Sequence, residues 1–348
     1  MRELTKILVT GASGFVGTAV QQELRRAFYP VHAVMREHSD PQISCKLGSK
    51  IFRGDITDRA SMLPAFSSGT EAVVHTVGII DEEKHGDFER IHVEGTRNVV
   101  ELCREFGIKK LVHVSALGTR ANAKATYHRT KWAAEELVRA SGLAYTILRP
   151  SVIFGEGSEF VATLEMLARM PGFTPVIGTG KGKLQPIAVQ DVARMARQCL
   201  EDERTDGQAY DLGGPEVFTL DQMFRVIEAR LGKPNKAHRY FPIALGETFA
   251  SITATEPFKT LGNWVSRNII PLPKLNNDQL IMLQEDSVTD GAAAKGVFDW
   301  QLARFSDWVS SPEYVEQPWR GWKSRWLITP PGDPTPQSGA GRGTIPKH

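Results

Sequence analysis

Short apolar runs alternate with longer amphipathic stretches along the first 150 residues of the chain. The short runs are rich in Val, Ile and Leu, which is typical of strands that are buried on both faces. The longer stretches place apolar residues at the spacing of one helix face, which predicts helices. This alternation predicts an α/β fold with a doubly wound parallel sheet. The expected strands are 6–10, 31–35, 50–53, 72–77, 110–115 and 144–148, and the expected helices include 16–27, 95–106 and 127–141.

A glycine-rich segment joins the first expected strand to the first expected helix. Gly11, Gly14 and Gly17 form a G-x-x-G-x-x-G pattern at the carboxyl end of the strand. Gly11 permits a tight turn, Gly14 lets the backbone approach a pyrophosphate, and Gly17 lets helix and strand pack closely. The helix N-terminus offers free N–H groups and the positive end of its dipole to phosphates. The pattern predicts a Rossmann-type dinucleotide site, to which the same loop contributes Ser13, Phe15 and Val16.

The end of the second strand bears on the choice of cofactor. Arg36 is the first residue after that strand, where a guanidinium pairs with the 2′-phosphate of NADP(H). Glu37 would instead accept the ribose hydroxyl of NAD(H) if the turn is displaced by one residue, and we expect NADP(H) in preference. Asp55 follows the third strand, where it would meet the adenine ring or serve as the N-cap of the next helix. The ends of the strands are expected to complete the nucleotide site with Ile56, Thr76, Val77 and Pro150.

A second group of residues follows the fifth expected strand. Ser115 ends that strand, and Tyr127 and Lys131 form a Y-x-x-x-K pattern on the next expected helix. Residues four apart share a helix face, so the phenol and the ammonium group point into the same space. A nearby cation lowers the pKa of a tyrosine, so Tyr127 would act as acid or base, Lys131 would also hold the nicotinamide ribose, and Ser115 would orient a substrate carbonyl. The alternative is that Tyr127 and Lys131 bind the cofactor without turnover.

Beyond Pro150 the pattern is less regular. Further elements are expected at 185–200, 208–212 and 220–231, followed by an α-rich region over 241–308. The end of the chain is rich in Pro, Gly and polar residues and cannot bury enough apolar surface to fold. We therefore expect a nucleotide-binding domain over 1–150, completion of the sheet and a smaller substrate lobe over 151–328, and a disordered tail over 329–348.

Composition limits the class of protein. Lys and Arg number 42 against 40 Asp and Glu, a net charge of +2, so no overall field favours nucleic acid. No apolar run approaches the roughly 18 residues of a membrane-spanning helix, and the first strand begins too early for a signal or transit peptide. The three cysteines are far apart, which excludes a disulfide framework and suits a cytoplasmic protein. No His or Cys spacing indicates a metal, and His75, His92 and His113 are expected to be hydrogen-bonded residues of the core.

Four segments together resemble the short-chain dehydrogenase/reductase superfamily, in its extended or atypical branch. They are the glycine motif over 10–17, H-V-E-G-T-R-N over 92–98, L-R-P-S-V-I-F-G over 148–155 and Q-P-I-A-V-Q-D-V-A over 185–193. Two further segments, 177–181 and 278–286, are similar to one subfamily, the dehydrogenase-like accessory subunit of respiratory complex I (NADH:ubiquinone oxidoreductase) and its bacterial relatives. The bacterial relatives are described as NAD-dependent epimerases or dehydratases. The resemblance covers about residues 5–310.

The resemblance implies an NADPH-binding protein. In the complex I subunit the nucleotide is regarded as structural and is not turned over. One position departs from the extended branch, because His92 stands where its members often carry Asn. The resemblance implies that the Asn of the extended branch supports the geometry of the active site, and this chain lacks that Asn.

Three tryptophans near the end of the chain form a separate pattern. Trp319, Trp322 and Trp326 would share one helix face and are interleaved with basic residues. Aromatic rings next to cations suit a bilayer surface with anionic headgroups, or a partner complex. The alternative is a helix that packs its Trp face on the substrate lobe.

Two hypotheses follow. The first is an NADP(H)-dependent oxidoreductase or isomerase in the cytoplasm, acting on a small apolar substrate of quinone or lipid character. The second is a non-catalytic nucleotide-binding accessory or assembly subunit of complex I, docked peripherally at the inner membrane through the tryptophans.

Overall fold

The computed structural model describes residues 4–82, 84–242, 276–311 and 314. The expected tail over 329–348, the three tryptophans Trp319, Trp322 and Trp326, and residues 243–275 of the expected α-rich region lie outside these residues.

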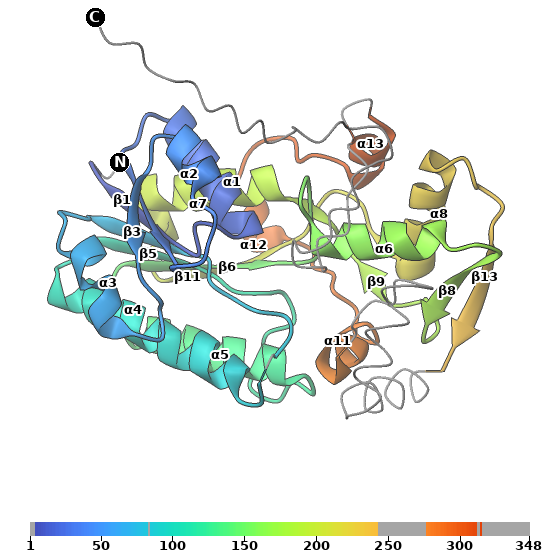
Figure 1. The fold of residues 1–348 in the computed structure, drawn as a ribbon, viewed down its shortest axis with the longest axis horizontal. Coiled ribbons are helices and arrows are strands. Elements are labelled where there is room, and N and C mark those ends of the chain that lie inside the picture. Colours follow the sequence, from blue (N-terminus) through green and yellow to red (C-terminus); the bar gives the residue numbers. More distant parts are fainter. Residues whose placement is uncertain (1–3, 83, 243–275, 312–313, 315–348) are drawn as a thin grey trace, which may run out of the picture.

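Seven parallel strands form the central sheet, in the order β11-β6-β5-β4-β1-β2-β3 (Figure 1). Their bounds are Ile7–Thr10 (β1), Val31–Met35 (β2), Lys50–Arg53 (β3), Ala72–His75 (β4), Lys110–Val114 (β5), Tyr145–Pro150 (β6) and Gln208–Leu212 (β11). Strands β1, β2, β4 and β5 are buried along their whole length, which explains their apolar sequences. The order reverses between β1 and β4, so the crevice at their carboxyl ends is where such sheets bind ligands. The expected α/β class and doubly wound sheet are confirmed.

Helices cover both faces of this sheet. They are Phe15–Arg26 (α1), Gln42–Lys46 (α2), Arg59–Phe66 (α3), Gly95–Glu105 (α4), Thr126–Arg139 (α5) and Val189–Glu201 (α7). In Figure 1, α1 and α7 lie on one face and α3, α4 and α5 on the other. Successive residues of β1 point to opposite faces, so Val9 packs in the cluster of α1 and α7 while Leu8 packs in that of α3 and α4.

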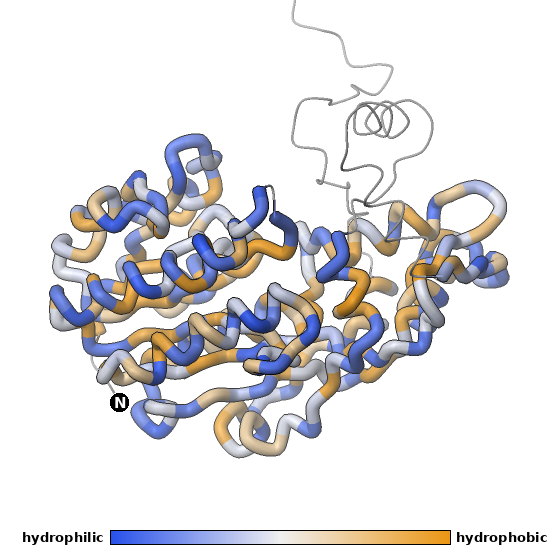
Figure 2. The backbone as a smooth tube through the Cα atoms, turned by 90° about the horizontal axis from the view of Figure 1, so that it is seen from below, coloured by the Kyte–Doolittle hydropathy of each residue, from blue (hydrophilic) through white to orange (hydrophobic). Residues whose placement is uncertain are grey.

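A smaller lobe adjoins the carboxyl end of the sheet. Three pairs of short strands belong to it, β7–β10 and β8–β13 in parallel and β9–β12 antiparallel. Its core contains Phe154, Phe224 and Phe305. Apolar segments run through both parts of the molecule (Figure 2). The elements are Ile153–Phe154 (β7), Glu159–Arg169 (α6), Phe173–Ile177 (β8), Lys183–Leu184 (β9), Ile187–Ala188 (β10), Phe218–Thr219 (β12), Leu220–Arg230 (α8), Ala237–Phe241 (β13), Asn277–Met282 (α11), Ala292–Lys295 (α12) and Phe305–Ser310 (α13).

Several boundaries differ from those expected. The strand expected over 72–77 ends at His75, because Thr76 bonds back to the carbonyl of Thr10 through its hydroxyl. The element expected over 185–200 contains a short strand and a helix, because Ile187 and Ala188 pair with β7 as β10 and α7 begins at Val189. The helix expected from residue 95 is preceded by a π-helical turn, η1, over Glu89–Glu94.

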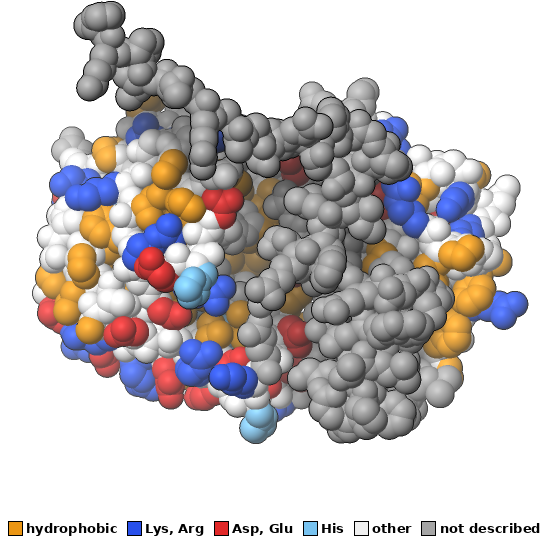
Figure 3. Space-filling view, viewed as in Figure 1, with side chains coloured by type: hydrophobic (Ala, Val, Ile, Leu, Met, Phe, Trp, Pro, Cys, Tyr) orange, Lys and Arg blue, Asp and Glu red, His pale blue; other side chains and the backbone are white. Residues whose placement is uncertain are grey.

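Acidic and basic side chains are interspersed over the part of the molecule that contains the seven-stranded sheet, on the face drawn in Figure 3. Among the helices in the described ranges, none has the length and apolar character needed to cross a membrane.

Candidate nucleotide and active site

The glycine loop has the geometry that a bound pyrophosphate requires. Gly11 has a φ of +71°, and the Gly14 N–H donates to its carbonyl at 2.9 Å. A Cβ on Gly17 would lie 2.1 Å from the Gly11 carbonyl oxygen, so only glycine lets α1 pack this closely. Gly14 is the N-cap of α1 and supplies no side-chain acceptor to its first-turn N–H groups. Ser13 and Gly14 are exposed, and these donors fit a phosphate.

Two cations lie at the carboxyl ends of β2 and β3. Arg36 and Glu37 are both exposed after β2. The Arg53 guanidinium donates to the carbonyls of Arg36 and Ser39, each at 2.9 Å, and so orders the turn that carries Arg36. Arg53 was not predicted from the sequence as a site residue. Its signal was a basic residue at the end of the strand next to β2.

Asp55 does not cap α3. Its carboxylate accepts from the backbone N–H and the hydroxyl of Thr57, at 2.9 and 2.8 Å. The N-cap is Asp58, which accepts from two first-turn N–H groups. The interpretation of Asp55 as N-cap is therefore wrong, because α3 begins three residues too late for it.

The remaining strand ends are placed differently from one another. Thr76 and Val77 lie against the glycine loop, where a Cβ on Gly11 would be 2.9 Å from the Thr76 hydroxyl and 3.0 Å from the nearest Val77 methyl. Pro150 is buried at the end of β6. The Ile56 side chain packs in the core against Gly95 of α4. The structure thus brings Thr76 and Val77 to the glycine loop, and Ile56 contributes its side chain to the core.

Tyr127 and Lys131 lie on the first two turns of α5. Lys131 is buried and donates to the Val114 carbonyl at 2.9 Å. A Cβ on Gly78, after β4, would be 3.3 Å from the Lys131 Nζ. Burial lowers the pKa of Lys131 to about 8 and raises the pKa of Tyr127 to about 12. The expectation that Lys131 lowers the pKa of Tyr127 is wrong here, because the loss of water around the phenol acts in the opposite direction.

Ser115 is committed to another partner. Its hydroxyl donates to the buried carboxylate of Glu135 at 2.6 Å. Glu135 also forms ion pairs with Arg139 and Arg149, each at 2.6 Å. The structure therefore joins Ser115 to the middle of α5 and directs its hydroxyl to Glu135. Glu135 was not predicted as a site residue, although it continues the four-residue spacing of Tyr127 and Lys131 along one helix face.

His92 connects the loop after β4 to α5. Its Nε2 accepts the Ile79 N–H at 3.1 Å, so the proton is on Nδ1, which bonds to the Thr130 hydroxyl at 2.9 Å. Its ring meets that of Tyr127 edge to face, with centroids 5.5 Å apart. Burial and the charge of Lys131 lower the pKa of His92 to about 2, so the ring is neutral. His92, in the π-helical turn η1, thus connects the loop after β4 to α5.

The other two core histidines differ in their partners. His75 is bonded to the hydroxyls of Thr10 and Thr96, at 2.6 and 3.1 Å. Neither ring nitrogen of His113 has a hydrogen-bond partner among the described residues. The expectation is confirmed for His75 and His92 and wrong for His113, which packs beside His75 at a ring distance of 5.2 Å. The described residues contain no group of three or more His, Cys, Asp or Glu that could hold a metal ion.

A pocket of about 240 Å³ lies between α11 and the loop after β8. It is lined by Ile177, Gly178, Thr179, Gly182, Leu280, Leu283 and Gln284. Its side chains are mainly aliphatic, with one hydroxyl and one amide.

Residues 7–213 match the model of the NAD dependent epimerase/dehydratase family. The chain is 28% identical over 298 residues to subunit 9 of the NADH dehydrogenase (ubiquinone) 1 alpha subcomplex of Arabidopsis thaliana, covering 82% of this chain and 71% of that one. The alignment spans 62% of the corresponding Dictyostelium discoideum subunit. A ceramide reductase of Caulobacter vibrioides is 28% identical, over 59% of this chain and 67% of its own. A 2-alkyl-3-oxoalkanoate reductase of Stenotrophomonas maltophilia is 29% identical, over 66% and 76%.

The fold is similar to that of solved structures. UDP-glucose 4-epimerase of Thermotoga maritima superposes with a TM-score of 0.66 at 20% identity, covering 88% of this chain and 96% of that one.

Proposed function

The chain belongs to the NAD dependent epimerase/dehydratase family, and on that premise we propose that it is an NADP(H)-dependent oxidoreductase that reduces a carbonyl group of a lipid-like substrate in the cytoplasm. The observation that carries the proposal is the pairing of Tyr127 and Lys131 on α5 with the glycine loop at the same edge of the sheet. Ile177, Leu280 and Leu283 in the pocket beside α11 would contact the apolar part of such a substrate, and Thr179 and Gln284 would face its polar part. The two reductase relatives, whose names specify a ceramide and an alkyl oxoalkanoate, also support a lipid-like substrate.

The nucleotide would be held by the glycine loop and by the ends of β2 and β3. The first-turn N–H groups of α1 would bind its pyrophosphate, and Arg36 and Arg53 would bind a 2′-phosphate, which is why NADP(H) is proposed in preference to NAD(H). When bound, the nucleotide supplies or accepts a hydride. Thr76, Val77 and Gly78 would lie along it toward Lys131.

Side chains of α5 and of the π-helical turn η1 would supply the proton that the substrate oxygen takes up. With a pKa of about 12, the Tyr127 phenol is protonated at neutral pH, which favours the direction of reduction. Its O–H would donate to the substrate oxygen as the hydride arrives at carbon, giving an alcohol and a phenolate. Lys131 would stabilise that phenolate by its charge, and His92 would hold the ring edge-on from the side of β4.

Tyr127→Phe tests the assignment. We expect loss of NADPH-dependent reduction across a panel of long-chain 3-oxo lipids and a short-chain quinone, because the variant lacks the proton donor. Nucleotide affinity, measured by calorimetry, is expected to stay within about threefold of the wild-type value, since the glycine loop is untouched. Turnover that is unchanged in the variant would refute the role of Tyr127.

A second candidate function is a nucleotide-holding accessory subunit of NADH:ubiquinone oxidoreductase. The similarity to the Arabidopsis subunit over 82% of this chain favours it, and so does the commitment of the Ser115 hydroxyl to Glu135. Docking would be peripheral at the inner membrane, through Trp319, Trp322 and Trp326.

Two measurements separate the candidates. Denaturing the purified protein would release stoichiometric NADP(H) from a structural site, whereas an enzyme would be recovered largely empty. The full-length chain would sediment with inner membranes at low salt if it is a docked subunit, and deletion of residues 311–348 would release it. A full-length chain that never sediments would remove the support for docking.

A further inference from the structure

The start of α5 is closed by a residue from a distant part of the chain. Ala125 occupies the N-cap position and has no side chain that could accept a hydrogen bond. Instead, the N–H groups of Thr126 and Tyr127 donate to the two oxygens of Asp278, at 3.0 and 2.9 Å. A carboxylate shared by two N–H groups at the positive end of a helix is a charge-assisted cap. Figure 1 shows α11, which carries Asp278, beside the start of α5.

Residues close to Asp278 in the chain also contact the loop after β4 and the loop after β5. We refer to residues 276–287 as the clasp. Asn276 donates to the carbonyl of Ile80 and to the carboxylate of Asp81, both at 2.9 Å, in the loop that follows Gly78. Glu285 forms an ion pair with Arg120 at 2.8 Å, in the loop after β5. Three separate polar contacts therefore connect the clasp to these two loops.

The other end of the clasp belongs to the smaller lobe. Asp286 accepts the Lys183 N–H at 2.9 Å, and the Ser287 N–H donates to the Lys183 carbonyl at 2.7 Å. Leu280 and Leu283 line the aliphatic pocket opposite the loop after β8. The clasp thus forms one wall of that pocket and also caps α5, whose first turn contains Tyr127.

We propose that Asp278 is a positioning residue for Tyr127, which fixes the first turn of α5 relative to the pocket wall and so directs the phenol toward a substrate held there. The inference rests on the proposed function in taking Tyr127 as the proton donor. Because Tyr127 is the second residue of α5, any tilt or fraying of the first turn moves its ring directly. An Asp278 cap carried by the pocket wall removes that freedom.

The test compares Asp278→Ala and Asp278→Asn with Asp202→Ala. Asp202 also accepts a backbone N–H, that of Arg204 at 3.0 Å, but it lies beyond the end of α7 and serves as a matched control. We expect kcat to fall about 10- to 100-fold in Asp278→Ala with KM within about threefold, because misplacement of a reacting group costs rate more than binding. Asp278→Asn keeps one acceptor and is expected to recover part of the loss.

A second readout does not depend on turnover. The ring ¹³C resonance of Tyr127 in the NADPH complex, identified by its loss in Tyr127→Phe, should shift in Asp278→Ala and stay unchanged in Asp202→Ala. If both the resonance and kcat of Asp278→Ala match those of Asp202→Ala, Asp278 is a helix cap and nothing more, and the proposal is overturned. If the wild-type protein turns over no substrate, the proposed function fails, and the resonance alone still decides the role of Asp278.

Discussion

Lys131 is a charged residue in a buried position, one helical turn after Tyr127 on α5. Because burial lowers its pKa to about 8, it is still mostly protonated at neutral pH. We expect the rate of reduction to be constant below about pH 7 and to fall as the pH rises through 8, since the neutral amine cannot stabilise a phenolate. Tyr127 does not limit this profile, because its pKa is about 12. A rate that stays constant to pH 10 would contradict this role.

The same shift has a consequence for stability. Below pH 8 Lys131 is charged in both the folded and the unfolded chain, and folding carries the cost of burying the charge. Between about 8 and 10.5 the unfolded chain binds more protons, so stability rises with pH across this window. Relative to Lys131→Met, the nucleotide-free wild-type protein should therefore gain about 2 kcal/mol in free energy of unfolding between pH 7 and 10. A difference in free energy of unfolding between the wild-type protein and Lys131→Met that is the same at pH 7 and pH 10 would exclude this linkage.

Local chemistry decided which residues of the candidate site could be predicted. The roles of Gly11 and Gly17 follow from turn geometry and close packing within one βα unit, and the structure has both features. The roles of Glu135 and Asp278 depend on partners brought together by the fold. The pKa of Tyr127 was predicted in the wrong direction, because the sequence shows the neighbouring Lys131 but not the burial of the phenol.

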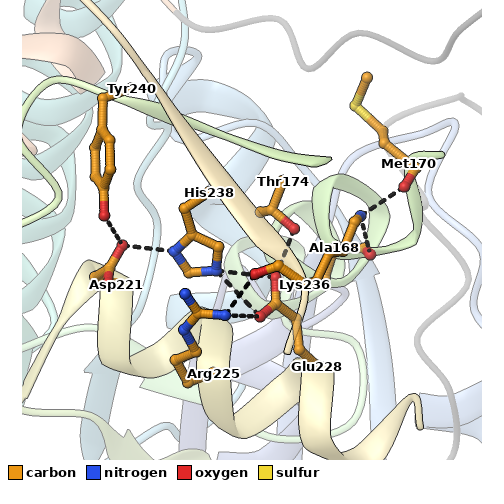
Figure 4. Close-up of polar contacts among 9 residues, drawn as sticks. All are labelled: Ala168, Met170, Thr174, Asp221, Arg225, Glu228, Lys236, His238 and Tyr240. Carbon is orange, nitrogen blue, oxygen red and sulfur yellow. Dashed lines mark hydrogen bonds and ion pairs between the residues drawn. The ribbon is translucent and has the colours of Figure 1, made fainter. Parts of the chain in front are cut away.

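At the scale of elements, the β8–β13 pair depends on one histidine. His238 of β13 lies between two carboxylates of α8, with Nδ1 2.7 Å from Asp221 and Nε2 3.0 Å from Glu228 (Figure 4). Each ring nitrogen of His238 thus lies within hydrogen-bonding distance of a carboxylate. Glu228 is fully buried and also accepts from Thr174 at 2.5 Å and from Arg225 at 3.3 Å. The cluster ties the edge strand to α8 at the base of the loop that lines the pocket.

His238→Ala should lower the free energy of unfolding by about 3 kcal/mol, because it leaves the buried Glu228 carboxylate with fewer partners. The control is Tyr240→Phe, which removes one exposed hydrogen bond to Asp221 and should cost less than about 1 kcal/mol. Urea denaturation at pH 7 measures both variants. Equal losses would mean that His238 contributes no more than a surface contact.

Elements with a clear apolar periodicity in their own sequence were predicted well. Elements that are defined by pairing with distant segments were not. The element expected over 208–212 appears as the strand β11 with the same bounds, and its two buried residues, Tyr210 and Leu212, alternate along the strand. β10 has only two residues and pairs with β7, so nothing local separates it from the helix that follows. The π-helical turn before α4 was missed for the same reason, because its hydrogen bonds differ from those of a helix while its apolar spacing does not.

The whole molecule consists of a sheet predicted from its pattern and a lobe whose internal order was not predicted. Central parallel strands are buried on both faces, so their sequences carry a strong signal. The lobe combines three pairs of strands with α6, α8 and shorter helices around Phe154, Phe224 and Phe305, and the arrangement of these elements is set by packing between segments far apart in the chain. The boundaries of the parts at 150 and 328 stay predictions.

The contact between Asp278 and α5 also has a consequence for synthesis. The N–H group of Thr126 and the carboxylate that closes it are 152 residues apart. A chain that leaves the ribosome from its N-terminus folds its first domain early, so the glycine loop and β1 to β6 are present long before Asp278 emerges. During that interval the first turn of α5 is unfinished. A chain released before Asp278 is synthesised would therefore lack the carboxylate that closes the first turn of α5, the turn that carries Tyr127.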